Sequence, residues 1–292
     1  MKKTRRLMSS LSPQPKPIRH TRKSARIAPP VLAPIPPMAD WQGCAATLIG
    51  SSHLKLYPPQ PCQDAALVVA GQRPLLLVAD GAGSATLSHQ GAQALVAGLR
   101  RLLETLADDY AAMLDGRETP DPVLLRKLAL RPVKHGMGLL QDLADTLHHD
   151  TKLLRSTLIV AIGGRSRWLW LRVGDGALVI EQAGKLQVVG TAGKGEYANQ
   201  TCFIDAQLQP QDVQFGVFDS AELSGVAAMS DGAAERLVQL HSGEVAGKLG
   251  QFMAQARQGR LGALQLHQFF SDPQAWLRTT GDDRALAVLA TA

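Results

Sequence analysis

Carboxylates stand at the predicted ends of strands in this 292-residue chain. Five apolar, strand-like segments each have aspartate directly before or after them: Asp64, Asp80, Asp175, Asp231 and the pair Asp282-Asp283. Carboxylates brought together repel one another by a few kcal/mol per close pair at an effective dielectric near 20. Mg²⁺ or Mn²⁺, which prefer oxygen ligands, relieve that repulsion without His or Cys. The aspartates therefore predict a divalent metal site.

Turns and helix caps are the alternative explanation for the same residues. Asp175-Gly176 is followed at once by another predicted strand, so it suits a two-residue hairpin turn. Asp80-Gly81 and Asp231-Gly232 precede helical segments, where aspartate could serve as an N-cap. Each aspartate taken singly leaves both interpretations open, and the combination favours the metal site.

Other catalytic and structural motifs are missing from the sequence. It contains no G-x-S-x-G motif, and no Gly-Lys pair is followed by Ser or Thr, which excludes a nucleophile elbow and a P-loop. Its three cysteines, with no C-x-x-C, cannot form a closed disulfide framework or a four-cysteine zinc site. We expect a reducing, cytoplasmic environment.

The positioning elements follow from hydrophobic periodicity. Strands are expected over residues 41–50, 65–70, 74–79, 156–162, 168–173, 177–181, 186–189, 213–218, 226–229 and 284–290. Helices are expected over 121–149, 233–240, 242–257, 263–270 and a segment that includes 92–103. Residues 65–79 should form a hairpin and the strands between 156 and 189 a meander, whereas 51–63 and 190–201 read as loops. The order predicts an α+β fold in which helices flank antiparallel sheets.

Charge is concentrated in the N-terminal segment, residues 1–38. This segment holds nine of the 31 Lys and Arg residues, no acidic residue and eight of the 17 prolines, so we expect a disordered basic tail. Residues 39–292 keep 22 basic and 25 acidic residues, a net charge of −3, which argues against a nucleic-acid-binding face. Because no apolar run approaches about 18 residues, we expect no membrane span.

An ordered set of short motifs resembles the metal-dependent protein phosphatases of the protein phosphatase 2C type. The motifs are Gln63-Asp64, Val78-Ala79-Asp80-Gly81-Ala82-Gly83, Ser156-Thr157-Leu158, Val173-Gly174-Asp175-Gly176, Met229-Ser230-Asp231-Gly232 and Gly281-Asp282-Asp283. The resemblance covers residues 40–291 and implies a four-layer α/β/β/α sandwich, in which helix pairs flank two antiparallel sheets. Further residues, Gly50, His53 and 195–201, are similar to a bacterial branch associated with a Ser/Thr kinase and a von Willebrand A-type protein.

The resemblance also implies roles for individual residues. Asp80 would bridge two metals, Mn²⁺ or Mg²⁺, and the carbonyl of Gly81 would bind the second. Asp231 and Asp283 would complete the first site, and Asp175 matches a weaker third-metal position. Asp64 would hold the catalytic water, making Asp64 and Asp80 the catalytic residues.

Two positions depart from the family pattern. Gln63 stands where the family commonly has an acidic residue that helps the second metal through water, and Pro59 stands where it has a phosphate-binding arginine. Lys55 or His53 could supply the missing cation, although a solvated loop role is the alternative for each.

The expected function is hydrolysis of phosphoserine or phosphothreonine in proteins, by a monomer acting on a phosphoprotein. The alternative is a weak or inactive relative that uses the same fold to bind a kinase or phosphoproteins. A third interpretation gives the main function to the basic tail, which would bind nucleic acid or anionic lipid.

Overall fold

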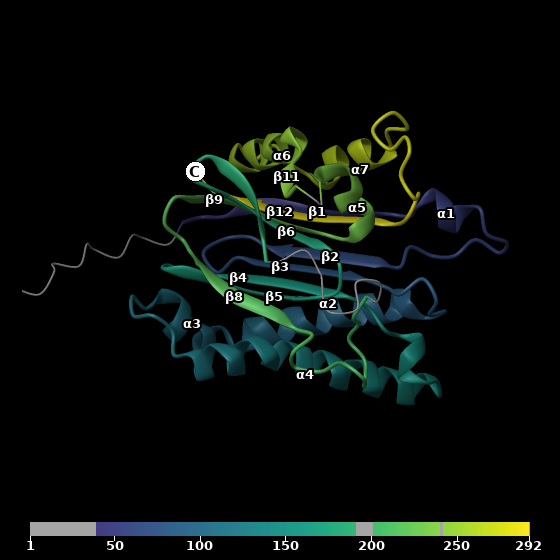
Figure 1. Ribbon diagram of the computed structural model, residues 1–292, viewed down its shortest axis with the longest axis horizontal. Coiled ribbons are helices and arrows are strands. Elements are labelled where there is room, and N and C mark those ends of the chain that lie inside the picture. Colours follow the sequence, from purple (N-terminus) through teal and green to yellow (C-terminus); the bar gives the residue numbers. More distant parts are fainter. Residues whose placement is uncertain (1–38, 191–200, 240–241, 292) are drawn as a thin grey trace, which may run out of the picture. The chain divides into compact units, whose positions relative to one another are not determined.

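The computed structural model describes residues 39–190, 201–239 and 242–291. The tail predicted over 1–38 and most of the loop predicted over 190–201 therefore lie outside the described residues. Two five-stranded sheets, in which every pair of neighbouring strands is antiparallel, form the centre of the described part (Figure 1).

The first sheet has the strand order β1-β12-β9-β6-β7. Its strands are β1 (Gln42–Leu48), β12 (Arg284–Ala290), β9 (Leu223–Met229), β6 (Ala177–Gln182) and β7 (Lys185–Val189). The second sheet has the order β2-β3-β4-β5-β8. Its strands are β2 (Asp64–Val69), β3 (Leu75–Asp80), β4 (Leu158–Gly163), β5 (Arg167–Val173) and β8 (Gln214–Asp219).

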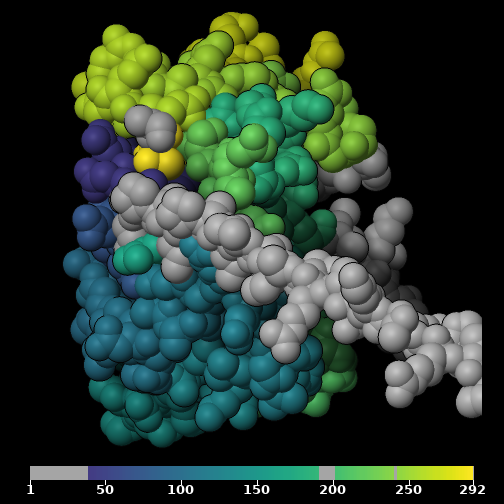
Figure 2. All heavy atoms as spheres, turned by 90° about the vertical axis from the view of Figure 1, so that its left-hand side faces the viewer, coloured from purple at the N-terminus to yellow at the C-terminus, as the bar shows by residue number. Residues whose placement is uncertain are grey.

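Helices cover the outer face of each sheet, on opposite sides in Figure 1 and again in the side view of Figure 2. The second sheet carries α2 (Ser88–Thr105), α3 (Ala107–Asp115) and α4 (Pro122–Leu147), followed by the short 3-10 helix η1 (Thr151–Leu153). The first sheet carries α5 (Asp231–Leu237), α6 (Gly247–Arg257) and α7 (Ala263–Ser271). A two-stranded hairpin joins β10 (Val238–Gln239) to β11 (Glu244–Val245).

Three apolar clusters separate these four layers. In β3, Leu75 and Leu77 pack against α2–α4, whereas Leu76 and Val78 face the other sheet. In the same way, Leu286 of β12 faces α5–α7, whereas its sequence neighbours Ala285 and Ala287 face β2 and β3 of the other sheet. Successive strand side chains point to opposite faces, so a strand covered on both faces must be apolar at nearly every position. The predicted α+β fold with four layers is confirmed.

Several element predictions are also confirmed, among them the 65–79 hairpin and the helix over 121–149. The side chain of Asp121 starts α4 by accepting hydrogen bonds from the backbone N–H groups of Val123 and Leu124. Within the described ranges, no helix has the length and apolarity that crossing a bilayer requires.

Four predictions about elements are wrong. The 51–63 loop contains the one-turn helix α1 (Ser51–Leu54), the helix expected over 233–240 ends at Leu237, and the one expected from 242 begins only at Gly247. The hairpin β10–β11 explains both displaced helix ends, because its backbone pairs with itself instead of continuing a helix. The predicted meander is wrong between β5 and β6, because these two strands belong to different sheets and do not pair. Local periodicity identifies a strand but not its sheet.

Candidate active site

A cavity of about 470 Å³ opens where strand ends from both sheets meet, beside α1. Five aspartates line it, together with neutral polar, apolar and glycine residues and His53. The aspartates are Asp80, Asp175, Asp231, Asp282 and Asp283. The two sheets thus bring together aspartates that are up to 203 positions apart in the sequence, Asp80 and Asp283.

Asp80, Asp175 and Asp231 form a close carboxylate group in the cavity lining. One oxygen from each lies within 4.8 Å of the other two. Asp80 ends β3 in one sheet, and Asp231 opens α5 directly after β9 in the other. Asp175 lies on the crossover from β5 to β6, so the hairpin interpretation of Asp175-Gly176 is wrong. Three converging carboxylate oxygens suit a hard divalent cation.

Thr201, the first described residue after position 200, contacts this carboxylate group. Its hydroxyl donates to Oδ2 of Asp175 over 2.7 Å, and Asp175 is exposed. Asp80 and Asp231 are half-buried, so of the three carboxylates Asp175 lies nearest to solvent. Asp175 therefore has one oxygen already engaged by the protein.

Asp64 lies behind Asp80, directly opposite it in the β2–β3 pair. Its side chain is buried, and its Oδ2 has no hydrogen-bond partner among the described residues. Burial, followed by the charge of Asp283, raises the pKa of Asp64 to about 8, although hydrogen bonds from Ser230 and Asp80 oppose this. Burial and the neighbouring carboxylates also raise the pKa of Asp80 well above its ordinary value. The same causes raise the pKa of Asp231. The protein thus concentrates carboxylates that a cation would stabilise in their charged form.

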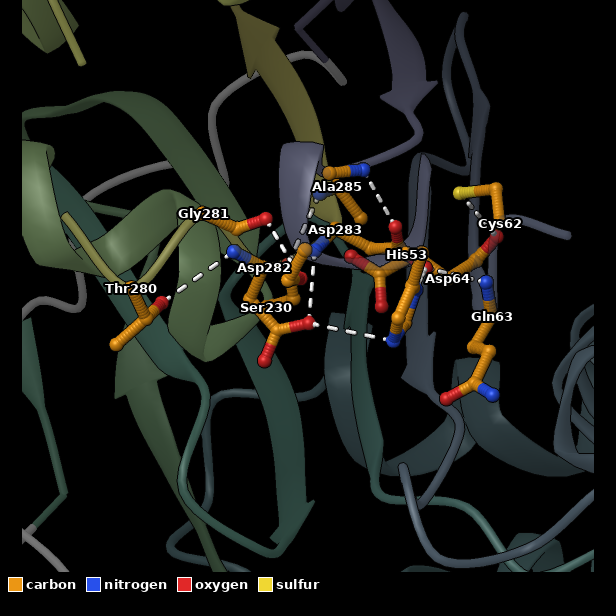
Figure 3. Close-up of polar contacts among 12 residues, drawn as sticks. His53, Cys62, Gln63, Asp64, Ser230, Thr280, Gly281, Asp282, Asp283 and Ala285 are labelled. Carbon is orange, nitrogen blue, oxygen red and sulfur yellow. Dashed lines mark hydrogen bonds and ion pairs between the residues drawn. The ribbon is translucent and has the colours of Figure 1, made fainter. Parts of the chain in front are cut away.

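Backbone and hydroxyl groups fix Asp80 from the neighbouring strand. The backbone N–H of Thr157 donates to the carbonyl of Asp80 over 2.7 Å, and the Ser156 hydroxyl donates to the same oxygen over 2.8 Å. The Asp80 N–H in turn donates to the Thr157 hydroxyl over 3.1 Å. Ser230 accepts from the N–H of Ala285 over 2.9 Å, which ties the end of β9 to β12 (Figure 3). These supports explain the hydroxyl residues of the motifs, whose roles the sequence alone left open.

Asp283, predicted as a metal ligand, is held by the backbone. Its Oδ1 accepts from the N–H of Gly50 over 2.6 Å, and its Oδ2 accepts from the N–H of Gln63 over 2.5 Å. Nδ1 of His53 lies 3.0 Å from the same Oδ2 (Figure 3). Both oxygens of this buried carboxylate therefore have partners that join β12 to the segments before β2.

Asp282, by contrast, turns toward the cavity, and its side chain is 46% exposed. A Cβ at Gly50 would lie only 2.3 Å from the carbonyl carbon of Asp282, so glycine permits the close packing that sets this orientation. Sequence analysis left Asp282 without a role, although the doubled aspartate was a signal. A one-residue shift decides which carboxylate of such a pair faces the site.

The remaining predicted residues divide into those at the cavity and those away from it. Gln63 is buried and lines the cavity, and its Oε1 has no hydrogen-bond partner in the described ranges. Gly81 also lines it, and a Cβ there would lie 2.7 Å from that of Ser88. His53 reaches the cavity but is engaged by Asp283, whereas exposed Lys55 follows α1 outside the lining.

The donor set fits divalent metal. It offers carboxylate oxygens without a surrounding shell of cysteine or histidine ligands, and two buried oxygens, on Asp64 and Gln63, lack partners among the described residues. Hard cations and their bound waters take such oxygen ligands.

Comparisons with known proteins identify the family and the fold. The "Serine/threonine-protein phosphatase 3" of Escherichia coli (strain K12) is 29% identical over 262 residues, spanning 85% of this chain and 98% of the relative. The catalytic domain of the serine/threonine protein phosphatase PstP, solved with two manganese ions, matches with a TM-score of 0.57 at 16% identity, over 87% of this chain and 99% of that one. The serine/threonine phosphatase of S. agalactiae matches with a TM-score of 0.57 and 16% identity over 86% of this chain and 100% of that one. These structural likenesses concern the fold. The sequence profile of the family "Protein phosphatase 2C" matches residues 49–271, and the chain therefore belongs to the protein phosphatase 2C family.

Proposed function

We propose that this chain is a metal-dependent serine/threonine phosphoprotein phosphatase. The observation that carries the proposal is the meeting of Asp80, Asp175 and Asp231 within 4.8 Å in the lining of the cavity. Family membership and the name of the Escherichia coli relative support the same activity. Two divalent cations, Mn²⁺ or Mg²⁺, would lower the pKa of water and withdraw charge from the phosphate when bound.

The aspartates of the site have two roles, binding metal and positioning the residues around it. Asp80, the Gly81 carbonyl and Asp231 would hold metal, and Asp175 would serve a third, looser position. Asp282 takes the ligand role that the family resemblance had given to Asp283, because both oxygens of Asp283 already accept backbone hydrogen bonds. Asp283 positions the site by joining β12 to Gly50 and Gln63.

Asp64 and Gln63 act behind the metal ligands. The unpartnered Oδ2 of Asp64 accepts a hydrogen bond from the attacking water and so orients it. Oε1 of Gln63, also without a partner in the described chain, would accept a hydrogen bond from the hydration shell of a bound cation, but as a neutral group it adds no charge. Hydrolysis then requires no covalent enzyme intermediate, which agrees with the missing nucleophile motifs.

The biological setting follows from the family resemblance and the cysteine content. The substrate is a phosphorylated protein, and a cognate Ser/Thr kinase and a von Willebrand A-type protein are the proposed partners. Three cysteines, each free in the structure, support a cytoplasmic location. We infer one catalytic domain over 39–292, a monomeric state, and a basic, proline-rich tail over 1–38.

Phosphate release from a phosphothreonine peptide tests the proposal directly. We expect the full chain to release phosphate with Mn²⁺, to lose activity after exhaustive chelation, and to recover it on adding Mn²⁺ back. Asp80→Asn should lose nearly all turnover, whereas the exposed control Asp272→Asn should keep it. Full activity after chelation would overturn the mechanism.

A binding role without catalysis is the second candidate, favoured by the absence of arginine at Pro59 and of a carboxylate at Gln63. Phosphopeptide binding by the Mn²⁺-loaded chain without any phosphate release would identify it.

A further inference from the structure

We propose that Arg155 binds the phosphate group that is hydrolysed, as the cation at the rim of the catalytic cavity. The inference rests on the proposed phosphatase function and adds a substrate-binding residue that is neither a metal ligand nor a neighbour of Pro59 in sequence.

The electrostatics of the cavity call for such a group. Its lining contains five aspartates and no lysine or arginine, and Nδ1 of its His53 lies 3.0 Å from Oδ2 of Asp283. A phosphate monoester dianion entering this cavity meets the aspartates that the metals do not fully neutralise. A cation at the rim therefore contributes to substrate binding without competing for a metal position.

Strand pairing places Arg155 beside that cavity. Ser156 pairs antiparallel with Ile204, and the N–H of Ile204 donates to the carbonyl of Ser156 over 2.7 Å. Residues 155 and 203 are diagonal neighbours across this pair, on one face. The guanidinium of Arg155 accordingly lies over the ring of Phe203, 5.0 Å from its centroid, and Phe203 lines the cavity.

The loop after Asp80 holds Arg155 from the other side. The Arg155 carbonyl accepts from the N–H of Ala82 over 3.1 Å, and Nη2 donates to the Ser84 hydroxyl over 2.6 Å. Ala82 lines the cavity, so the backbone of Arg155 is attached to the wall that carries Asp80.

The guanidinium keeps binding capacity that its neighbours do not use. Arg155 is half-buried and forms no ion pair with a carboxylate of the described residues. Its Nε is buried and has no hydrogen-bond acceptor among them. Stacking on an aromatic ring leaves the N–H edge of arginine available, and that planar edge matches two phosphate oxygens. An oxyanion bound at the Nη groups supplies the missing counter-charge.

Steady-state kinetics with inorganic phosphate as a competitive product test the assignment in the full chain with Mn²⁺. The variants are Arg155→Ala and Arg155→Lys, with Arg126→Ala on the exposed surface of α4 as the matched control. For Arg155→Ala we expect KM for p-nitrophenyl phosphate and for a phosphothreonine peptide to rise about tenfold, with a similar rise in the phosphate inhibition constant. For Arg155→Lys we expect KM and the phosphate inhibition constant to lie between those of Arg155→Ala and the unaltered chain, because lysine keeps the charge but loses the planar fork.

Two further measurements separate this role from a structural one. The Mn²⁺ concentration for half-maximal activity and the thermal unfolding midpoint should stay within about twofold and a few degrees of the control. KM and phosphate inhibition equal to those of Arg126→Ala would overturn the inference. So would a KM effect confined to peptides with acidic flanking residues, because Arg155 would then bind a flanking carboxylate.

Failure of the proposed function remains distinguishable. If the unaltered chain releases no phosphate from any substrate, the phosphatase proposal fails. Calorimetric titration of the Mn²⁺-loaded proteins with inorganic phosphate then decides the role of Arg155. Weaker binding by Arg155→Ala supports it, whereas equal binding by all variants, or none by the unaltered chain, refutes it.

Discussion

Asp282 and Asp283 are adjacent carboxylates with different surroundings, and exchanging each for asparagine should separate metal binding from stability. Asparagine at 283 retains one carbonyl oxygen, so its amide group would face either the Gly50 or the Gln63 N–H, which now donate over 2.6 and 2.5 Å. Losing a hydrogen bond to a charged group costs roughly 1.5–3 kcal/mol. Relief of the repulsion with Asp64 offsets part of this, leaving about 1–2 kcal/mol of destabilisation.

Asp282→Asn should have the opposite pattern. The amide oxygen can still accept from the N–H of Asp283, as Oδ1 does now over 2.9 Å, so the unfolding midpoint of the metal-free protein should not fall. Loss of a charged ligand should cost metal binding roughly 1.5–3 kcal/mol, or about ten- to a hundredfold in Mn²⁺ affinity.

Thermal unfolding without metal and Mn²⁺ titration of phosphate release, performed on both variants, measure the two effects. A loss of 1–2 kcal/mol should lower the midpoint of Asp283→Asn by roughly 2–8 °C for a domain of this size. Asp272→Asn, an exposed carboxylate outside the cavity, is the control for the loss of one charge. The reasoning is refuted if Asp283→Asn unfolds like the control while its Mn²⁺ demand rises as much as that of Asp282→Asn.

Three further predictions concern the same site. Gln63→Glu places a negative charge near a metal, separated from it by a water, and the attraction between them is worth on the order of 1 kcal/mol. Half-maximal activity should therefore need about five- to tenfold less Mn²⁺, at unchanged KM. Superimposable metal titrations of the two proteins would place Gln63 outside the metal shell. Asp231→Asn should abolish nearly all turnover and Asp175→Asn less, because Asp175 is exposed and already accepts from Thr201; equally small losses would mean that turns were mistaken for ligands. Burial raises the pKa of Asp64 from 3.8 to about 8, so between these values the folded chain binds more protons than the unfolded chain, and stability of the metal-free protein should fall as pH rises. Mn²⁺ competes with those protons, so its stabilising shift of the unfolding midpoint should be larger at pH 8 than at pH 5, and an equal shift at both would contradict the assignment.

Strand ends and helix faces could be predicted from the sequence because their signals are local. The apolar run 74–79 before Asp80 and the run before Asp231 indicate strands buried on both faces, and the three- and four-residue spacing from Ala92 to Leu103 indicates α2. The carboxylates at those strand ends, and the oxygen-preferring metal that they favour, follow from residue type alone.

Only the tertiary structure decided which groups meet. Sheet membership is a non-local property, so the sequence could not place β5 and β6 in different sheets and left Asp175 open between a hairpin turn and a metal position. Side-chain direction in Asp282-Asp283 depends on one residue of register, which the close packing of Gly50 sets. Arg155 lies beside Phe203 because Ser156 pairs with Ile204 across 48 residues of chain, and no local pattern encodes that contact. Composition and periodicity thus determine the elements and their chemistry, whereas long-range pairing determines which oxygens and cations share one cavity.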